Sequence, residues 1–169
     1  MFKSWRRVET PARAPRLTQQ LARAFIARAV EQNDVLLATM VALGFHGLLR
    51  TGEPLSFRYK DIEFNRDCRV LCLHQSKTGL RTGAQEAVAI RDSLTLQLLE
   101  TQVSLRHPYP GDPLWPRSAQ SFREAFKQFC KWFQVDSLAF KPYSLRRGGA
   151  TWLLQSGAPL ESRDDTCER

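Results

Sequence analysis

The sequence has few cysteines and no apolar run long enough to cross a membrane. Its four cysteines form no CxxC pair and have no histidine cluster beside them, so we expect reduced thiols and no zinc. The most apolar stretch, residues 35–49, is shorter than the roughly 18 residues that span a bilayer, and it predicts a buried core helix. The N-terminal segment carries charge without an apolar core, so we expect it not to be a secretory signal.

Positive charge is what the sequence has in excess. Among 169 residues, 25 are Lys or Arg and 17 are Asp or Glu, giving a formal net charge of +8. A hydrophobic content of 43% suffices for one domain with a proper core. The charge alone leaves two interpretations about equally open, a polyanionic partner such as nucleic acid or simple solubility.

The periodicity predicts mostly helices. We expect them to open at or just after Thr18, Asn33 or Asp34, Asp92, Ser121 and Ser144. Gly52 and Pro54 break the pattern and permit a short further helical piece. Ser121 and Glu124 match a capping box at the start of a phenylalanine stripe that we assign to the core. Ser144 is expected to cap the last helix, which Gly157 ends.

Two short apolar runs, 69–74 and 86–90, are typical of strands joined in a hairpin, because the residues between them are rich in Gly, Thr and Lys. The predicted fold class is therefore mainly α with a small antiparallel β-sheet (α+β). Residues 1–16 look like a basic arm or linker, and the domain spans 17–160. A divergent tail covers 161–169.

Basic residues stand at the ends of three of these elements. Arg50 follows the apolar helix with Glu53 three residues on, Lys77 lies in the hairpin loop, and Arg146 opens the last helix. Element ends can present side chains to a ligand from a rigid scaffold. Two arginines offer planar forks for phosphate oxygens, and a lysine adds a mobile charge and a proton.

These segments resemble the tyrosine recombinases of the phage integrase family. "GLLRTGEPLSFRYKDI" resembles the first conserved box, with Arg-x-x-Glu ending a buried helix. "SKTG" is similar to the hairpin lysine motif, and "YSLRRGGATWLLQSGAP" to the second box, His-x-x-Arg. The resemblance covers about residues 17–160, most of a catalytic domain. Three motifs in order are more specific than any one of them.

The resemblance implies an enzyme that breaks and rejoins double-stranded DNA through a 3′-phosphotyrosyl link. By position, Arg50 and Arg146 would hold the phosphate, Lys77 would protonate the leaving oxygen, and Glu53 would support the arginines. Tyr143 stands at the usual His position as a weaker donor that does not carry positive charge near neutral pH. The resemblance implies no cofactor or metal. It also implies an intracellular protein, in the nucleus if eukaryotic and in the cytoplasm if bacterial or phage.

The nucleophilic tyrosine is the main departure from the family. Its expected position lies beyond Arg169, and none of Tyr59, Tyr109 and Tyr143 lies where a nucleophile is expected. We therefore expect DNA binding by a recombinase-like domain that is catalytically incomplete alone. A partner subunit that donates a tyrosine, or a homo-oligomer, is one alternative. A non-enzymatic basic helical interaction protein with a relic motif is another.

Other basic residues are weaker candidates. Arg147 is assigned to DNA binding, although a solvated or backbone-contacting side chain is the commoner role for such a residue. Arg6 and Arg7 in the arm fit phosphate contact about as well as a solvated linker. His46 and His74 are given no role.

Overall fold

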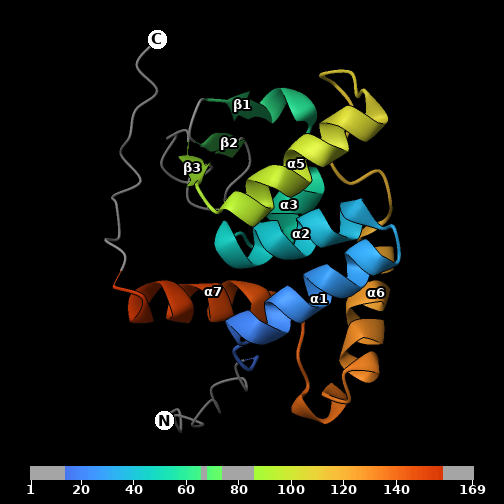
Figure 1. Cartoon of the computed structure of the whole chain (residues 1–169), viewed down its shortest axis with the longest axis vertical. Helices are drawn as coiled ribbons and strands as arrows, with labels where there is room; N and C mark the ends of the chain where they lie inside the picture. The colour runs from blue at the N-terminus through green and yellow to red at the C-terminus, as the bar shows by residue number, and fades with distance from the viewer. Residues whose placement is uncertain (1–13, 66–67, 74–85, 158–169) are drawn as a thin grey trace, which may run out of the picture.

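The computed structural model describes residues 14–65, 68–73 and 86–157. The helices are α1 (Gln19–Glu31), α2 (Val35–His46), α3 (Gly52–Ser56), α5 (Ser93–Arg106), α6 (Ala119–Trp132) and α7 (Tyr143–Gln155), with 3₁₀ turns η1 (Tyr59–Asp61) and η2 (Asp136–Leu138). The strands are β1 (Ile62–Phe64), β2 (Arg69–Leu73) and β3 (Glu86–Ile90). Figure 1 shows the sheet at one end of the helical body. The predicted fold class, mainly α with a small antiparallel sheet, is confirmed.

Helix α2 forms the centre of the helical body. Every residue from Leu37 to Phe45 is buried, as its nearly continuous apolar sequence predicts. It packs against α1, α5 and α7 (Figure 1). A helix surrounded in this way is fixed in position, so the residues that follow it are presented from a rigid base.

Helix α6 closes the other side of α1 with its phenylalanine stripe. Phe25 of α1 lies 5.2–5.4 Å, between ring centroids, from Phe126, Phe129 and Phe133. The stripe is therefore core. Offset and edge-on aromatic pairs of this kind add to the area they bury.

The sheet has one more strand than predicted. β2 pairs antiparallel with β3, as the hairpin requires, and their connecting loop lies outside the described residues. β1 pairs on the other edge, with Ile62 opposite Leu71. β1 has only three residues, too few to show an alternating pattern in the sequence.

Three helix caps are where the sequence puts them, and two are not. Thr18, Asp34 and Asp92 cap α1, α2 and α5. The capping box expected at Ser121 is wrong, because the cap of α6 is Ser118, three residues earlier, and the helix begins at Ala119. The Ser118 hydroxyl there accepts a hydrogen bond from the Ser121 N–H at 3.0 Å. Ser118 follows the irregular proline-rich segment directly, so it is the first serine that can accept a hydrogen bond from the free N–H groups at the start of α6.

Helix α7 begins before its expected cap. Pro142 precedes its first residue, and Ser144 lies inside the first turn, fully buried. The Ser144 hydroxyl accepts a hydrogen bond from the Lys141 N–H at 3.0 Å, and its carbonyl accepts one from Leu17 N–H at 3.2 Å. Ser144 therefore joins α7 to the segment before α1 rather than capping the helix. The end of α7 agrees with the sequence, because Gly157 follows with a φ of +67°.

Candidate phosphate-binding site

The route from α2 to Arg50 is a sharp turn. Gly47 ends α2, and Leu48 then takes a left-handed conformation with a φ of 49°. Such a φ is unfavourable for a residue with a side chain, but Leu49 next to it is buried and anchors the turn. The turn directs the chain away from the core and leaves Arg50 at the edge of the core.

Glu53 holds Arg50 in two ways. Its Oε1 lies 2.9 Å from the Arg50 guanidinium Nη1, and its Oε2 accepts a hydrogen bond from the Arg50 backbone N–H at 2.6 Å. The Glu53 N–H returns a bond to the Arg50 carbonyl at 2.8 Å. The Arg-x-x-Glu spacing produces this arrangement, because it puts the carboxylate one helical turn from the arginine.

Arg146 reaches the same carboxylate from α7. Its Nη1 lies 3.8 Å from the Glu53 Oε2, so residues almost a hundred positions apart in the sequence share one carboxylate. The exposed fractions of the side chains are 35% for Arg50, 21% for Arg146 and 11% for Glu53. The carboxylate is thus the most buried member, and the two arginine side chains are partly exposed. Two positive charges and one negative charge leave the trio net positive.

Two adjacent glycines allow α7 to approach this closely. A Cβ on Gly148 would lie 1.8 Å from the Leu17 carbonyl oxygen, and one on Gly149 would lie 1.9 Å from the Phe45 carbonyl oxygen. Any larger residue would push α7 away from α2 and from the segment before α1. The sequence contains this glycine pair directly after the two arginines, and its packing role was not predicted.

Of the remaining candidate residues, Tyr143 and Arg147 lie on α7, and the others lie outside the described residues. Tyr143 is the first residue of α7 and is 47% exposed. The Arg147 guanidinium donates a hydrogen bond to the Ala14 carbonyl, so it contacts backbone. Lys77, Arg6 and Arg7 lie outside the described residues.

The other two tyrosines have unlike environments. Tyr59 is 7% exposed, and its hydroxyl donates a hydrogen bond to the Gln102 side-chain oxygen at 2.9 Å. Burial raises the pKa of Tyr59 above its ordinary value, although Arg106 beside it acts in the opposite direction. Tyr109 is 78% exposed in the loop before α6. Within the described residues, no hydrogen bond or ring contact joins either tyrosine to Arg50, Arg146 or Glu53.

Sequence reasoning missed a contact of His46. The imidazole Nδ1 lies 2.6 Å from Asp92 Oδ1, and the ring stacks on Trp152 of α7 at 5.5 Å between centroids. Burial raises the pKa of Asp92, but hydrogen bonds from His46 and Thr95 outweigh it and lower the value to about 2. In the sequence, the indication of this contact was a histidine at the end of an otherwise apolar helix.

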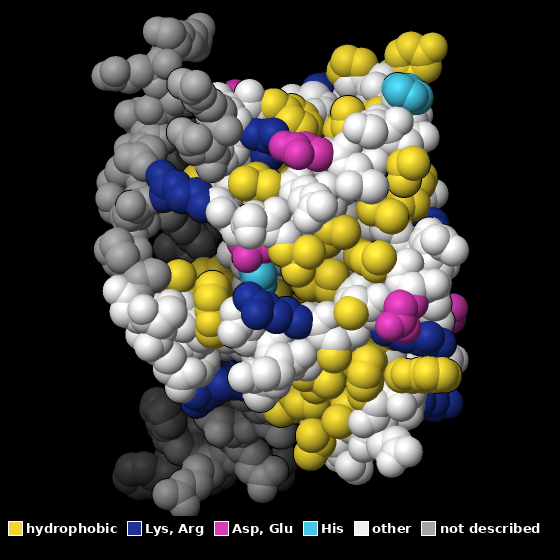
Figure 2. All heavy atoms as spheres, viewed as in Figure 1, with side chains coloured by type: hydrophobic (Ala, Val, Ile, Leu, Met, Phe, Trp, Pro, Cys, Tyr) yellow, Lys and Arg dark blue, Asp and Glu magenta, His cyan; other side chains and the backbone are white. Residues whose placement is uncertain are grey.

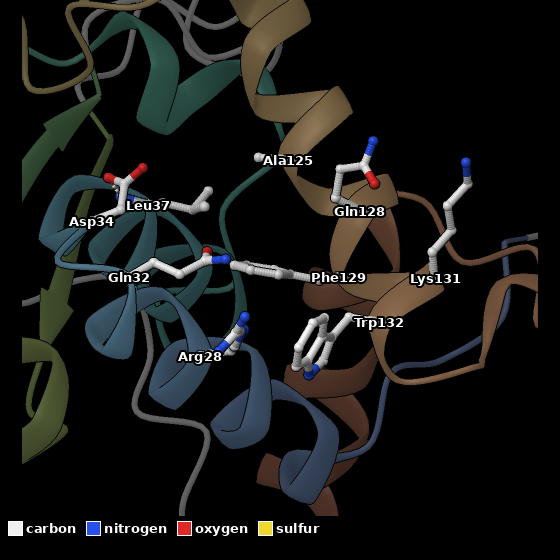
Figure 3. A pocket seen from close by; sticks show the side chains of 9 residues that line it. All are labelled: Arg28, Gln32, Asp34, Leu37, Ala125, Gln128, Phe129, Lys131 and Trp132. Carbon is white, nitrogen blue, oxygen red and sulfur yellow. Dashed lines mark hydrogen bonds between the residues drawn. The ribbon is translucent and has the colours of Figure 1, made fainter.

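The charged side chains do not form one continuous patch on the face drawn in Figure 2. Lys and Arg side chains are scattered over it, and hydrophobic side chains gather around α6 and its junction with α1 (Figure 2). A groove of about 640 Å³ lies there, lined mainly by α6 and also by Arg28 of α1 and Leu37 of α2, with Trp132 and Arg28 at one end (Figure 3). None of the three residues of the trio lines it.

Metal and membrane sites are not found in the described ranges. Within residues 14–65, 68–73 and 86–157, no three or more His, Cys, Asp or Glu side chains come together as metal ligands would. The described helices also include none that is both long and apolar enough to cross a bilayer.

The helical fold and the Arg50–Glu53–Arg146 site lie within a region that matches a known protein family. The model of the phage integrase family matches residues 15–163, nearly the whole chain. The chain belongs to this family. Among curated proteins, none matches it.

Solved structures of Xer recombinases share the fold of this integrase-family chain. The XerA recombinase matches with a TM-score of 0.67 and 18% identity over 89% of this chain and 53% of its own. The XerH recombinase bound to its difH substrate before cleavage matches with a TM-score of 0.67 and 15% identity, over 88% of this chain and 45% of its own. The chain therefore spans about half the length of these recombinases and has the fold of a tyrosine recombinase catalytic domain.

Proposed function

We propose that Arg50 and Arg146 bind one phosphodiester of duplex DNA, within a domain that serves site-specific recombination. The observation that carries the proposal is the shared contact with Glu53, which holds both guanidinium groups at one place while the two arginine side chains stay partly exposed. Arginine forks match phosphate oxygens geometrically. Family membership and the difH-bound XerH relative support DNA as the polyanion.

The chemistry of the site is electrostatic. Two fixed cations beside one phosphate stabilise the negative charge that develops when its P–O bond is exchanged. We assign Lys77 to protonation of the leaving oxygen and Tyr143 to a neutral hydrogen bond at the family's His position. Glu53 keeps the guanidinium groups in place and offsets their mutual repulsion.

We further propose that this chain alone binds DNA without attaching to it. Tyr59 is a poor nucleophile because its hydroxyl is buried and already hydrogen-bonded. Tyr109 lies in a loop and Tyr143 occupies the donor position. A denaturation-resistant protein–DNA adduct on a nicked duplex would contradict this part of the proposal.

A salt series of duplex binding tests the phosphate contact. The variant Arg50→Ala/Arg146→Ala is compared with Arg23→Ala/Lys60→Ala, which removes the same charge from two exposed positions on α1 and η1. We expect the first variant to bind more weakly at each salt concentration and to lose about 0.9 from the slope of log K against log salt, the amount for one phosphate.

The control in this series separates a specific site from general basicity. If the two double variants have the same duplex affinity and the same salt slope, Arg50 and Arg146 contribute only net charge. A non-enzymatic basic interaction protein then becomes the better description. If neither the wild-type chain nor the variants bind duplex DNA, the proposal fails altogether.

A further inference from the structure

We propose that His46 is a positioning residue for the Arg50–Arg146 pair, an inference that rests on the proposed function. Its side chain is only 3% exposed although it ends the helix that leads to Arg50. It contacts Asp92 of the α5 cap and Trp152 of α7. His46 therefore links the elements that carry the two arginines to a third helix.

The hydrogen bond to Asp92 fixes the imidazole ring. Asp92 Oδ1 accepts from the Thr95 N–H at 2.8 Å and from the Thr95 hydroxyl at 2.7 Å, in addition to facing His46 Nδ1. An ionised carboxylate oxygen only accepts hydrogen bonds, so the imidazole Nδ1 that lies 2.6 Å from it is the donor and carries a hydrogen. Within the described residues, Nε2 is buried and has no hydrogen-bond partner. Orientation of the ring thus depends on Asp92 and on stacking.

The stacking contact passes this orientation to α7. The rings of His46 and Trp152 are nearly parallel, with 20° between their planes, and Phe45 also lies against Trp152 at 6.1 Å. One turn earlier on α7, Gly149 sits directly on the Phe45 carbonyl. Because Arg146 precedes Gly149 on the same helix, a change in this contact moves Arg146 relative to Arg50.

Variants can separate positioning from stability. His46→Leu removes the donor and keeps an apolar side chain of moderate size, whereas His46→Asn keeps an N–H donor near the Nδ1 position. Thr95→Val is the matched control, because it removes a donor to the same Asp92 oxygen and a 3.4 Å contact of the Thr95 hydroxyl with His46 Nδ1, but keeps the 2.6 Å Asp92–His46 contact and the Trp152 stacking. Asp92→Ser keeps a helix cap but is too short to reach His46.

The readout is the salt slope of duplex binding, which counts phosphate contacts and is unaffected by a folded fraction that stays constant across the salt series. We expect His46→Leu and Asp92→Ser to lose about 0.9 from the slope, like Arg50→Ala/Arg146→Ala. His46→Asn and Thr95→Val should keep the wild-type slope. If His46→Leu does not fold, Asp92→Ser decides the question.

Two results would overturn the inference and are distinguishable. A wild-type slope in His46→Leu or Asp92→Ser, with a reduced slope in the arginine variant, removes the role of His46 and leaves the proposed function standing. An unchanged slope in Arg50→Ala/Arg146→Ala removes the proposed function and the inference together.

Discussion

Two aspartates of this domain cap helices in the same way but differ in what their second partner does. Asp34 caps α2 by accepting the Leu37 N–H at 3.1 Å, and Asp92 caps α5 by accepting the Thr95 N–H at 2.8 Å. Each also faces a basic side chain from a distant part of the sequence. Asp34 lies 2.5 Å from the Arg117 guanidinium, and Asp92 lies 2.6 Å from the His46 imidazole.

Burial distinguishes the two pairs. The Arg117 side chain is 43% exposed, whereas that of His46 is 3% exposed and is stacked against α7. An exposed ion pair is screened by solvent and contributes little, while a buried donor that loses its acceptor is costly. The comparison shows that Asp34 mainly caps its own helix, whereas Asp92 also holds His46 against α7, the helix that carries Arg146.

The largest expected effect comes from breaking the packing on which the buried pair depends. Gly149→Ala places a methyl group 1.9 Å from the Phe45 carbonyl oxygen, so α7 must move. We expect a loss of about 3 kcal/mol or more in the free energy of unfolding, measured by denaturant titration. Gly52→Ala is the control, because nothing lies within 4 Å of its added Cβ, and it should be neutral or slightly stabilising. Equal effects of the two substitutions would contradict the packing role of Gly149.

Removing the two caps sharpens the comparison directly. Asp92→Ala loses a cap and leaves the buried His46 Nδ1–H with only the longer 3.4 Å contact to the Thr95 hydroxyl, so we expect about 2 to 4 kcal/mol of destabilisation. Asp34→Ala loses a cap and an exposed ion pair, for which about 1 kcal/mol is expected. Denaturant titration of both variants in one buffer measures the difference. A loss as large for Asp34→Ala would show that burial of the partner does not matter.

Acid provides a smaller test of the buried pair. The pKa of Asp92 is lowered from 3.8 to about 2, so its ionised form stabilises the fold above about pH 4, and this contribution is lost as the pH falls towards 2. Allowing for partial solvent screening, it amounts to about 1 to 2 kcal/mol. The stability difference between wild type and Asp92→Asn should therefore shrink over this pH window. A difference that stays constant from pH 5 to pH 2 would contradict the shift.

The smallest expected effect belongs to the exposed partner. Arg117→Ala should change the free energy of unfolding by less than about 1 kcal/mol, and high salt should remove most of that change. Thermal or denaturant unfolding at low and high salt measures it. A loss of several kcal/mol that persists in high salt would place Arg117 with the buried pair instead.

The sequence predicted the local parts of this comparison and not the contacts between them. Asp92 was predicted as a cap, and Asp34 was one of two candidates with Asn33, because capping depends on neighbours three residues away. The Arg-x-x-Glu contact was predictable for the same reason. His46 received no role, because its partners Asp92 and Trp152 come from other helices and leave no periodic pattern around it. The glycine pair of α7 was visible, but only the close approach of Leu17 and Phe45 explains it.

The central claim is that Arg50 and Arg146 hold one phosphate together, and a double-mutant cycle on duplex affinity tests it most directly. Arg50→Ala, Arg146→Ala and the double variant are compared with wild type at one fixed low salt concentration. If both arginines act on one phosphate, either single substitution should remove most of the effect, with a coupling of about 1 kcal/mol or more. Losses that add to within about 0.5 kcal/mol would show two independent contacts and would contradict the account.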